Sequence, residues 1–290
     1  MNFVQQPFTF VCGSETLLGI VSRPEQPHPR GVLIVVGGPQ YRVGSHRQFV
    51  LLANHLAQQG TPVMRFDYRG MGDSTGERID FERATDDLRM AIDAFFERVD
   101  TLRDVIIWGL CDAASAALFY AHQDPRVSGI VLLNPWVRTI EGEARAYLRH
   151  YYVRRLLSPA SWHKLWRGEF DLSHSLGSLV DHFRNAMGGG GHARPQGAEV
   201  TQLPAVAGSL PERMAAGLAR FNGRILLILS GNDLTAKEFV DLCSASRQWR
   251  QLLASPRLTQ YMLPEATHTF SRREWRDQVA TWTESWVRSW

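Results

Sequence analysis

Cysteine is scarce in this sequence, with only Cys12, Cys111 and Cys243 among 290 residues. Their number is odd and no CxxC pair occurs, which argues against a disulfide framework and is typical of a reducing compartment. Residues 1–8 contain no basic segment followed by an apolar run, so the sequence predicts no secretory signal. We therefore expect a cytoplasmic protein.

Long hydrophobic runs and a large excess of one charge are also missing. The longest apolar run, residues 31–38, is too short to cross a bilayer as a helix. Lys+Arg 32 against Asp+Glu 29 leaves a formal net charge of +3, without a long Lys/Arg block. We therefore expect no binding to nucleic acid and no stable membrane insertion. No metal-ligand spacing or dinucleotide fingerprint occurs, so neither a metal nor another cofactor is predicted, and the oligomeric state stays open.

Hydrophobic residues make up 44% of the chain, enough for one large core or for a core with a smaller insert. Short apolar runs alternate with segments of helical spacing. After an opening hairpin at 8–12 and 16–22, the predicted strands are 31–36, 62–66, 104–108, 127–133, 224–229 and 258–263. The predicted helices are 46–59, 81–99, 112–122, 236–253 and 272–287. This alternation predicts an α/β fold, with a mostly parallel sheet and helices on both faces.

The alternation stops near Asn134 and resumes after Leu210. Residues 137–210 show no strand pattern, carry aromatic and basic residues such as Tyr147 and Arg149, and contain four consecutive glycines at 188–191. We therefore predict a core of residues 1–136 and 211–290, interrupted by a helical cap over residues 137–210.

Residues 104–115, DVIIWGLCDAAS, form the most informative stretch of the sequence. They combine a buried strand, a tight turn and a helix start, with Cys111 at the turn. This is the G-x-S-x-G nucleophile-elbow pattern, with cysteine in place of serine and Ala113 in place of the second glycine. A cysteine after a strand is more often an inert buried residue, but this setting favours a nucleophilic thiolate, stabilised by the helix start.

His268 and Asp233 are the predicted partners of Cys111. His268 follows the last predicted strand, and Asp233 lies past Gly231 after the preceding strand. The carboxyl ends of parallel strands share one edge, so an imidazole there can exchange a proton with the thiol while the carboxylate orients it. Each residue alone has an ordinary structural explanation, but the order Cys111, Asp233, His268 is that of a nucleophile, acid and base.

An acyl-transfer site also needs amide donors for the charge that develops on the carbonyl oxygen. We predict the backbone amides of Asp112 and Gly38 as these donors, with Gln40 as the alternative to Gly38. The alternative for Gly37 and Gly38 is that they only make the turn. The Asp112 carboxylate opposes thiolate formation unless it points away or is paired, and a helix cap or a substrate contact are its two candidate roles.

Two further loops border the predicted site. Residues 40–47 supply Gln40, Arg42 and His46, which we predict to bind an anionic part of the substrate, although a solvated loop explains them at least as well. Residues 67–76, DYRGMGDSTG, lack the Gly-Lys-Ser/Thr of a phosphate-binding loop. We interpret Arg69 and Asp73 as structural residues that brace loops under the site.

Together these motifs resemble those of the α/β-hydrolases over nearly the whole chain outside the cap. The resemblance comprises VGGP at 36–39, DYRGMGDSTG at 67–76, GLCDA at 109–113, GND at 231–233 and HTF at 268–270. Val36 stands where the family usually has histidine. The resemblance implies the α/β-hydrolase fold, but it says little about the substrate because the superfamily supports many chemistries on this scaffold.

More narrowly, GGPQYRVGSHR at 37–47 with GLCDAAS at 109–115 resembles the exosortase A system-associated hydrolase 1 group of bacterial proteins. The cysteine nucleophile is similar to that of dienelactone hydrolases, which use Cys-Asp-His. We expect an enzyme that hydrolyses esters, thioesters or lactones, with a small acyl substrate that is free or linked to a carrier. The alternatives are an acyltransferase to a sugar or amine and a non-catalytic binding protein with this fold.

Overall fold

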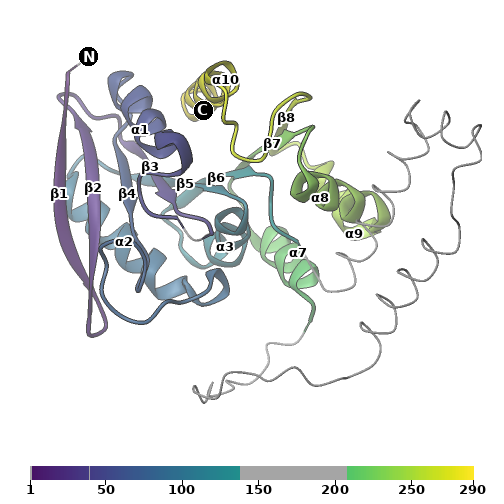
Figure 1. Cartoon of the computed structure of the whole chain (residues 1–290), viewed down its shortest axis with the longest axis horizontal. Coiled ribbons are helices and arrows are strands. Elements are labelled where there is room, and N and C mark those ends of the chain that lie inside the picture. The colour runs from purple at the N-terminus through teal and green to yellow at the C-terminus, as the bar shows by residue number, and fades with distance from the viewer. Residues whose placement is uncertain (1, 39, 138–207) are drawn as a thin grey trace, which may run out of the picture. The chain divides into compact units, whose positions relative to one another are not determined.

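The apolar runs of the sequence form one eight-stranded sheet with the order β1-β2-β4-β3-β5-β6-β7-β8 (Figure 1). The structure is a computed structural model that describes residues 2–38, 40–137 and 208–290. Strands β1 and β2 pair antiparallel, as do β2 and β4, and all other neighbours are parallel. The strands are β1 Phe3–Cys12, β2 Glu15–Pro24, β3 Arg30–Val35, β4 Val63–Phe66, β5 Asp104–Leu110, β6 Val127–Leu133, β7 Arg224–Ser230 and β8 Leu258–Leu263.

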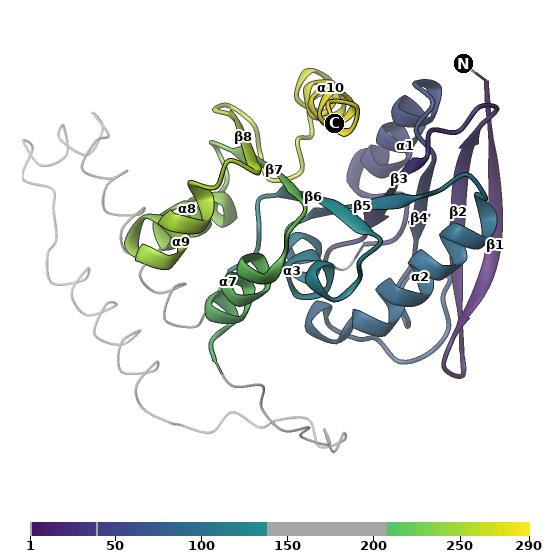
Figure 2. The same ribbon diagram turned by 180° about the vertical axis from the view of Figure 1, so that it is seen from behind.

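The central strands are buried on both faces because helices cover both sides of the sheet. Helices α1 and α10 lie on one side, and α2, α3 and α7 lie on the other (Figures 1 and 2). The helices are α1 Gln48–Gln58, α2 Thr85–Arg98, α3 Asp112–Tyr120, α7 Leu210–Arg220, α8 Leu234–Ala245, α9 Arg247–Leu253 and α10 Arg273–Val287. This architecture confirms the predicted α/β fold class.

One core lies on each side of the sheet. On the first side, Phe49 of α1 packs edge-on against Trp108 of β5, with 5.7 Å between ring centroids. On the second side, Leu88 and Phe95 of α2 join a larger cluster that also contains Met214 of α7. Burial of each such side chain contributes about 1.5–3 kcal/mol. The sheet is therefore a rigid platform for the loops at its carboxyl edge.

Two helices differ from the sequence prediction. The single helix predicted at 236–253 is divided into α8 and α9 at Ser246, which has extended backbone angles. The Ser246 side chain accepts a hydrogen bond from the Trp249 amide and so starts a new helix. Helix α7 was not predicted, although Ser209 and Glu212 form a capping box at its start, a signal that is visible in the sequence.

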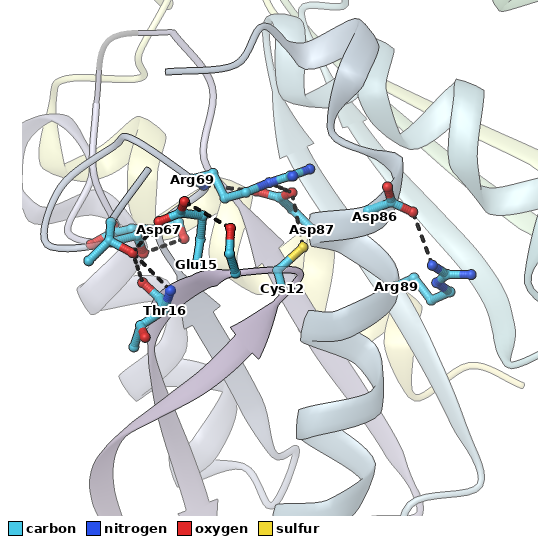
Figure 3. Close-up of polar contacts among 11 residues, drawn as sticks. Cys12, Glu15, Thr16, Asp67, Arg69, Asp86, Asp87 and Arg89 are labelled. Carbon is cyan, nitrogen blue, oxygen red and sulfur yellow. Dashed lines mark hydrogen bonds and ion pairs between the residues drawn. The ribbon is translucent and has the colours of Figure 1, made fainter. Parts of the chain in front are cut away.

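The loop at 67–76 is held against its surroundings by ion pairs. Arg69 donates to the buried Asp87 of α2 at 2.6 Å, and the Cys12 thiol also contacts Asp87 (Figure 3). Asp73 forms an ion pair with Arg42 at 2.6 Å. These contacts are structural, as the sequence predicted for Arg69 and Asp73, and they hold the loop beside the carboxyl edge of the sheet.

The cap predicted at 137–210 lies outside the described residues, apart from its ends. Val137 is the last described residue before this interval, and α7 begins at Leu210 after it. Its helical character therefore stays a prediction. Among the described helices, none has both the length and the apolar character needed to cross a membrane.

Candidate active site

Cys111 lies in the turn between β5 and α3, at the carboxyl edge of the sheet. Its backbone angles are φ 63° and ψ −124°, a conformation that is rare for a residue with a side chain. The Cys111 amide donates to the Leu133 carbonyl at 2.9 Å, and the Cys111 carbonyl accepts from Ala114 and Trp136. These bonds hold the strained turn, which has the geometry of a nucleophile elbow.

Gly109 allows this turn to be tight. A Cβ atom there would lie 2.6 Å from the carbonyl carbon and oxygen of Ala113 and 2.7 Å from the nitrogen of Ala114. These are backbone atoms of α3, so they cannot move aside without displacing the helix.

We expect Gly109→Ala to reduce the free energy of unfolding by about 2–3 kcal/mol, because overpacking strains the strand and helix. Urea unfolding measures this change. Gly13→Ala is the comparison, since a Cβ atom there would meet nothing within 4 Å and only its positive φ, which Gly109 lacks, would cost about 1 kcal/mol. Equal losses in the two variants would show that close contact with α3 is not the reason for Gly109.

The structure brings Asp233 and His268 together beside Cys111. Nδ1 of His268 lies 2.8 Å from Oδ2 of Asp233. The Asp233 carboxylate is only 8% exposed, and it also accepts hydrogen bonds from the amides of Thr235 and Ala236 at the start of α8. A nearly buried, hydrogen-bonded carboxylate therefore fixes the orientation of the imidazole.

The pKa of His268 is raised to about 10. The hydrogen bond that the ring donates to Asp233 is the main cause, followed by the hydrogen bond with Cys111, while burial acts in the opposite direction. An imidazole in this setting is positively charged at neutral pH and favours an anion next to it. The contacts of His268 thus connect Asp233, His268 and Cys111 into one chain of hydrogen bonds.

The loops that carry Asp233 and His268 contact each other where they leave the sheet. A Cβ atom at Gly231 would lie 2.2 Å from the carbonyl oxygen of Pro264, so only glycine lets the two loops approach. The buried Asn134 side chain donates to Ser230 at 2.8 Å and to the His268 carbonyl at 3.0 Å. Asn134 and Ser230 were not predicted as supporting residues. A polar residue at the end of an apolar strand is the feature of the sequence that indicates this role.

The predicted oxyanion amides already have a ligand. The Gly38 amide donates to both carboxylate oxygens of Asp112, at 2.7 Å and 2.9 Å. Asp112 directly follows Cys111, and its short side chain turns back so that the carboxylate reaches these amides. The carboxylate therefore binds donors that were predicted for a substrate oxygen, and two of these amides lie at the start of α3, where a helix cap was the other prediction.

Burial raises the pKa of Asp112, and hydrogen bonds from the amides of Gly38, Ala113 and Asp112 itself oppose this effect. The positive charge of His268 also favours the ionised form. Asp112 and Cys111 therefore lie near the same cation.

The three predicted substrate-binding side chains have other contacts or none. Gln40 accepts the Ser45 amide at 2.9 Å, which closes its own loop. Arg42 pairs with the fully buried Asp67, and only 14% of its side chain is exposed. These contacts give Gln40 and Arg42 a structural role, and their predicted substrate binding stays a prediction. His46 is exposed on its loop, where no contact with the triad places it in the site.

Within residues 2–38, 40–137 and 208–290, no group of three or more His, Cys, Asp or Glu side chains is placed to hold a metal ion. The groups that the described site offers for chemistry include the thiol, the imidazole, the carboxylates and the backbone amides.

The mostly parallel sheet, the elbow and the strand-end loops define an α/β-hydrolase. The model of the family described as serine aminopeptidase, S33, matches residues 27–179, more than half of the chain, and the chain belongs to this family. It is therefore a hydrolase. At the level of sequence, no curated protein matches it.

Solved structures of hydrolases have the same fold. An esterase from Pyrococcus furiosus is 14% identical with a TM-score of 0.65, covering 99% of this chain and 92% of its own. A dienelactone hydrolase from Anabaena variabilis is 16% identical with a TM-score of 0.61, covering 98% and 96%. A proline iminopeptidase from Mycobacterium smegmatis is 14% identical with a TM-score of 0.58, covering 97% of each chain. These similarities extend to the fold alone.

Proposed function

We propose that the chain is a thiol-dependent hydrolase of esters, thioesters or lactones, in which Cys111 is the nucleophile. The observation that carries this proposal is the chain of hydrogen bonds from Asp233 through His268 to Cys111, at the strained turn after β5. A nucleophile, a base and an orienting carboxylate in this arrangement are the parts that acyl transfer requires.

In the proposed reaction, the Cys111 thiolate attacks the carbonyl carbon and forms a carbon–sulfur bond, while the carbonyl electrons move to oxygen. His268 then gives its proton to the departing alkoxide or thiolate, and a thioester with Cys111 remains. Water, deprotonated by His268, hydrolyses this thioester and restores the thiol. Asp233 keeps Nδ1 of the ring occupied, so the second ring nitrogen exchanges the proton.

The thiol nucleophile favours particular leaving groups. When a tetrahedral intermediate collapses, a thiolate leaves more easily than an amine, so attack on an amide tends to reverse. An ester with an activated alcohol, a thioester or a strained lactone has a leaving group that competes with Cys111. Although the family is described as serine aminopeptidase, we therefore propose an acyl ester or thioester as the substrate, free or linked to a carrier.

The loop motifs support a relationship to one particular group of α/β-hydrolases. Residues 37–47 and 109–115 support membership of the exosortase A system-associated hydrolase 1 group, whose genes lie near exopolysaccharide and protein-sorting genes. We accordingly propose a cytoplasmic location, which the three free cysteines support. Hydrolysis and transfer share the acyl-enzyme step, so product analysis with a sugar or amine acceptor distinguishes them.

Rapid mixing with a 4-nitrophenyl ester tests the proposed function. We expect a burst of nitrophenolate equal to the enzyme concentration, followed by slower turnover, with the acyl group recovered on the Cys111 peptide by mass spectrometry. Cys12 and Cys243 serve as internal controls, because burial raises their pKa values to about 11 and about 12. Acylation of those thiols in preference to Cys111 contradicts the proposal.

A further inference from the structure

The Asp112 carboxylate lies where an acyl-transfer reaction needs its oxyanion. It accepts hydrogen bonds from the amides of Gly38, Asp112 and Ala113. Donors of this kind, one next to the nucleophile and one from a neighbouring loop, stabilise the negative oxygen of a tetrahedral intermediate. A carboxylate and an oxyanion cannot occupy the same amides, so the carboxylate has to leave before the reaction proceeds.

A cavity next to the amides offers the carboxylate a second position. The cavity has a volume of about 300 Å³, and Gly38, Asp112 and Tyr68 all line it. Tyr68 is 5% exposed, and its hydroxyl group has no hydrogen-bond partner among the described residues. A buried hydroxyl without a partner costs about 1–3 kcal/mol. A carboxylate in the cavity that Tyr68 lines would offer this hydroxyl an acceptor.

Positively charged side chains on the cavity wall also favour a carboxylate in the cavity. Arg78 and Arg83 also line the cavity, and no ion pair within the described part of the chain engages either guanidinium. Asp80 lines the cavity as well, but its carboxylate accepts the amides of Glu82 and Arg83. A carboxylate that moved into this cavity would find the Tyr68 hydroxyl beside a wall that also carries Arg78, Arg83 and Asp80, all three exposed to solvent.

We propose that Asp112 is an internal ligand of the oxyanion-binding amides, which turns toward Tyr68 when a substrate carbonyl displaces it, and so determines which carbonyl groups the site accepts. This inference rests on the proposed function, since it concerns the same amides. The carboxylate carries a full charge, whereas a ground-state carbonyl oxygen carries a partial one. Strongly polarised carbonyls therefore compete best, and weakly activated alkyl esters compete worst.

Reversible addition of an aldehyde tests the proposal without requiring hydrolysis. The Cys111 thiolate adds to the carbonyl carbon of butanal, and the carbon–oxygen π electrons become an oxyanion that binds the amides or takes a proton from His268. The resulting hemithioacetal protects Cys111 from alkylation by iodoacetamide. The concentration of butanal that halves the alkylation rate of the Cys111 peptide gives its dissociation constant.

We expect Asp112→Ala to lower this dissociation constant about tenfold, because a charge-assisted competitor is removed. Asp112→Asn keeps the shape without the charge, and it should give an intermediate value. Asp86→Ala is the matched control, since Asp86 is an exposed carboxylate that pairs with Arg89 on α2. Thermal unfolding of each variant confirms that it is folded.

Tyr68→Phe tests the second position of the carboxylate. It should raise the dissociation constant several-fold in the wild type, and it should have no effect when Asp112 is already alanine. The Tyr68 hydroxyl has no partner, so its removal should not destabilise the resting protein. An equal effect of Tyr68→Phe in both backgrounds would overturn the role of Tyr68.

The charged and titratable groups around Asp112 are His268, Tyr68, Arg78, Arg83, Asp80 and the neighbouring Cys111 thiol. As pH falls through the raised pKa of Asp112, its carboxyl group loses the charge that binds the amides. The ratio between the wild-type and Asp112→Ala dissociation constants should therefore shrink toward one at acidic pH, whereas a merely structural role would keep it constant.

Equal or weaker binding of butanal by Asp112→Ala would overturn the proposal, as would absence of protection in both proteins. These outcomes are separable from failure of the proposed function. That function fails if no acyl group is found on Cys111, whereas the aldehyde experiment requires only a thiolate and vacated amides.

Discussion

Replacing Cys111 by alanine is expected to reduce kcat/KM for a 4-nitrophenyl ester by about ten-thousandfold or more. The reason is that no other described side chain at the elbow can form the covalent intermediate, and loss of a nucleophile in related hydrolytic triads has effects of this size. Steady-state kinetics under identical conditions measure the change. The stability of the protein should change little, because the side chain at position 111 is only partly buried.

Cys243→Ala is the matched control for this experiment. Cys243 is a buried thiol of α8 that contacts neither Asp233 nor His268 in the hydrogen bonds of the site, so its removal should cost stability and leave kcat/KM unchanged. If Cys111→Ala retains wild-type activity, the assignment of the nucleophile is wrong. If both variants lose activity equally, the loss reflects folding rather than chemistry.

Asp233→Asn is expected to reduce kcat/KM roughly a thousandfold to ten-thousandfold. The amide no longer stabilises an imidazolium, and it allows the unproductive tautomer of the ring. The pKa of His268, raised to about 10 mainly by its hydrogen bond to Asp233, should fall toward its ordinary value of 6.5. An NMR titration of the His268 ring measures this fall directly. A pKa that stays near 10 in the variant would contradict the role of Asp233.

The same variant should change how stability depends on pH. A raised pKa in the folded protein means that the Asp233–His268 interaction stabilises fully below about pH 6.5 and is lost as pH rises through about 10. The difference in free energy of unfolding between wild type and Asp233→Asn should therefore be largest near pH 6 and shrink as pH approaches 10. The asparagine side chain still caps α8, so the contribution of the cap to the free energy of unfolding should not vary with pH.

Local patterns in the sequence were sufficient to predict most of the fold. The strands at 127–133 and 258–263 have the predicted bounds, because uninterrupted apolar runs between turn residues leave little choice of structure. The break at Ser246 was missed because helical spacing continues across it, and only the cap on Trp249 shows the boundary. The cap at 137–210 remains a prediction of the sequence.

The sequence by itself determined the tight turn at Cys111, because short-range sterics require Gly109 before the turn and small residues after it. Only the tertiary structure decided what each polar group contacts. The Asp112 carboxylate binds the Gly38 amide 74 positions away, and Arg42 turns to the buried Asp67. Such pairings depend on which charges are desolvated together, and that is a property of the folded sheet edge rather than of neighbouring residues.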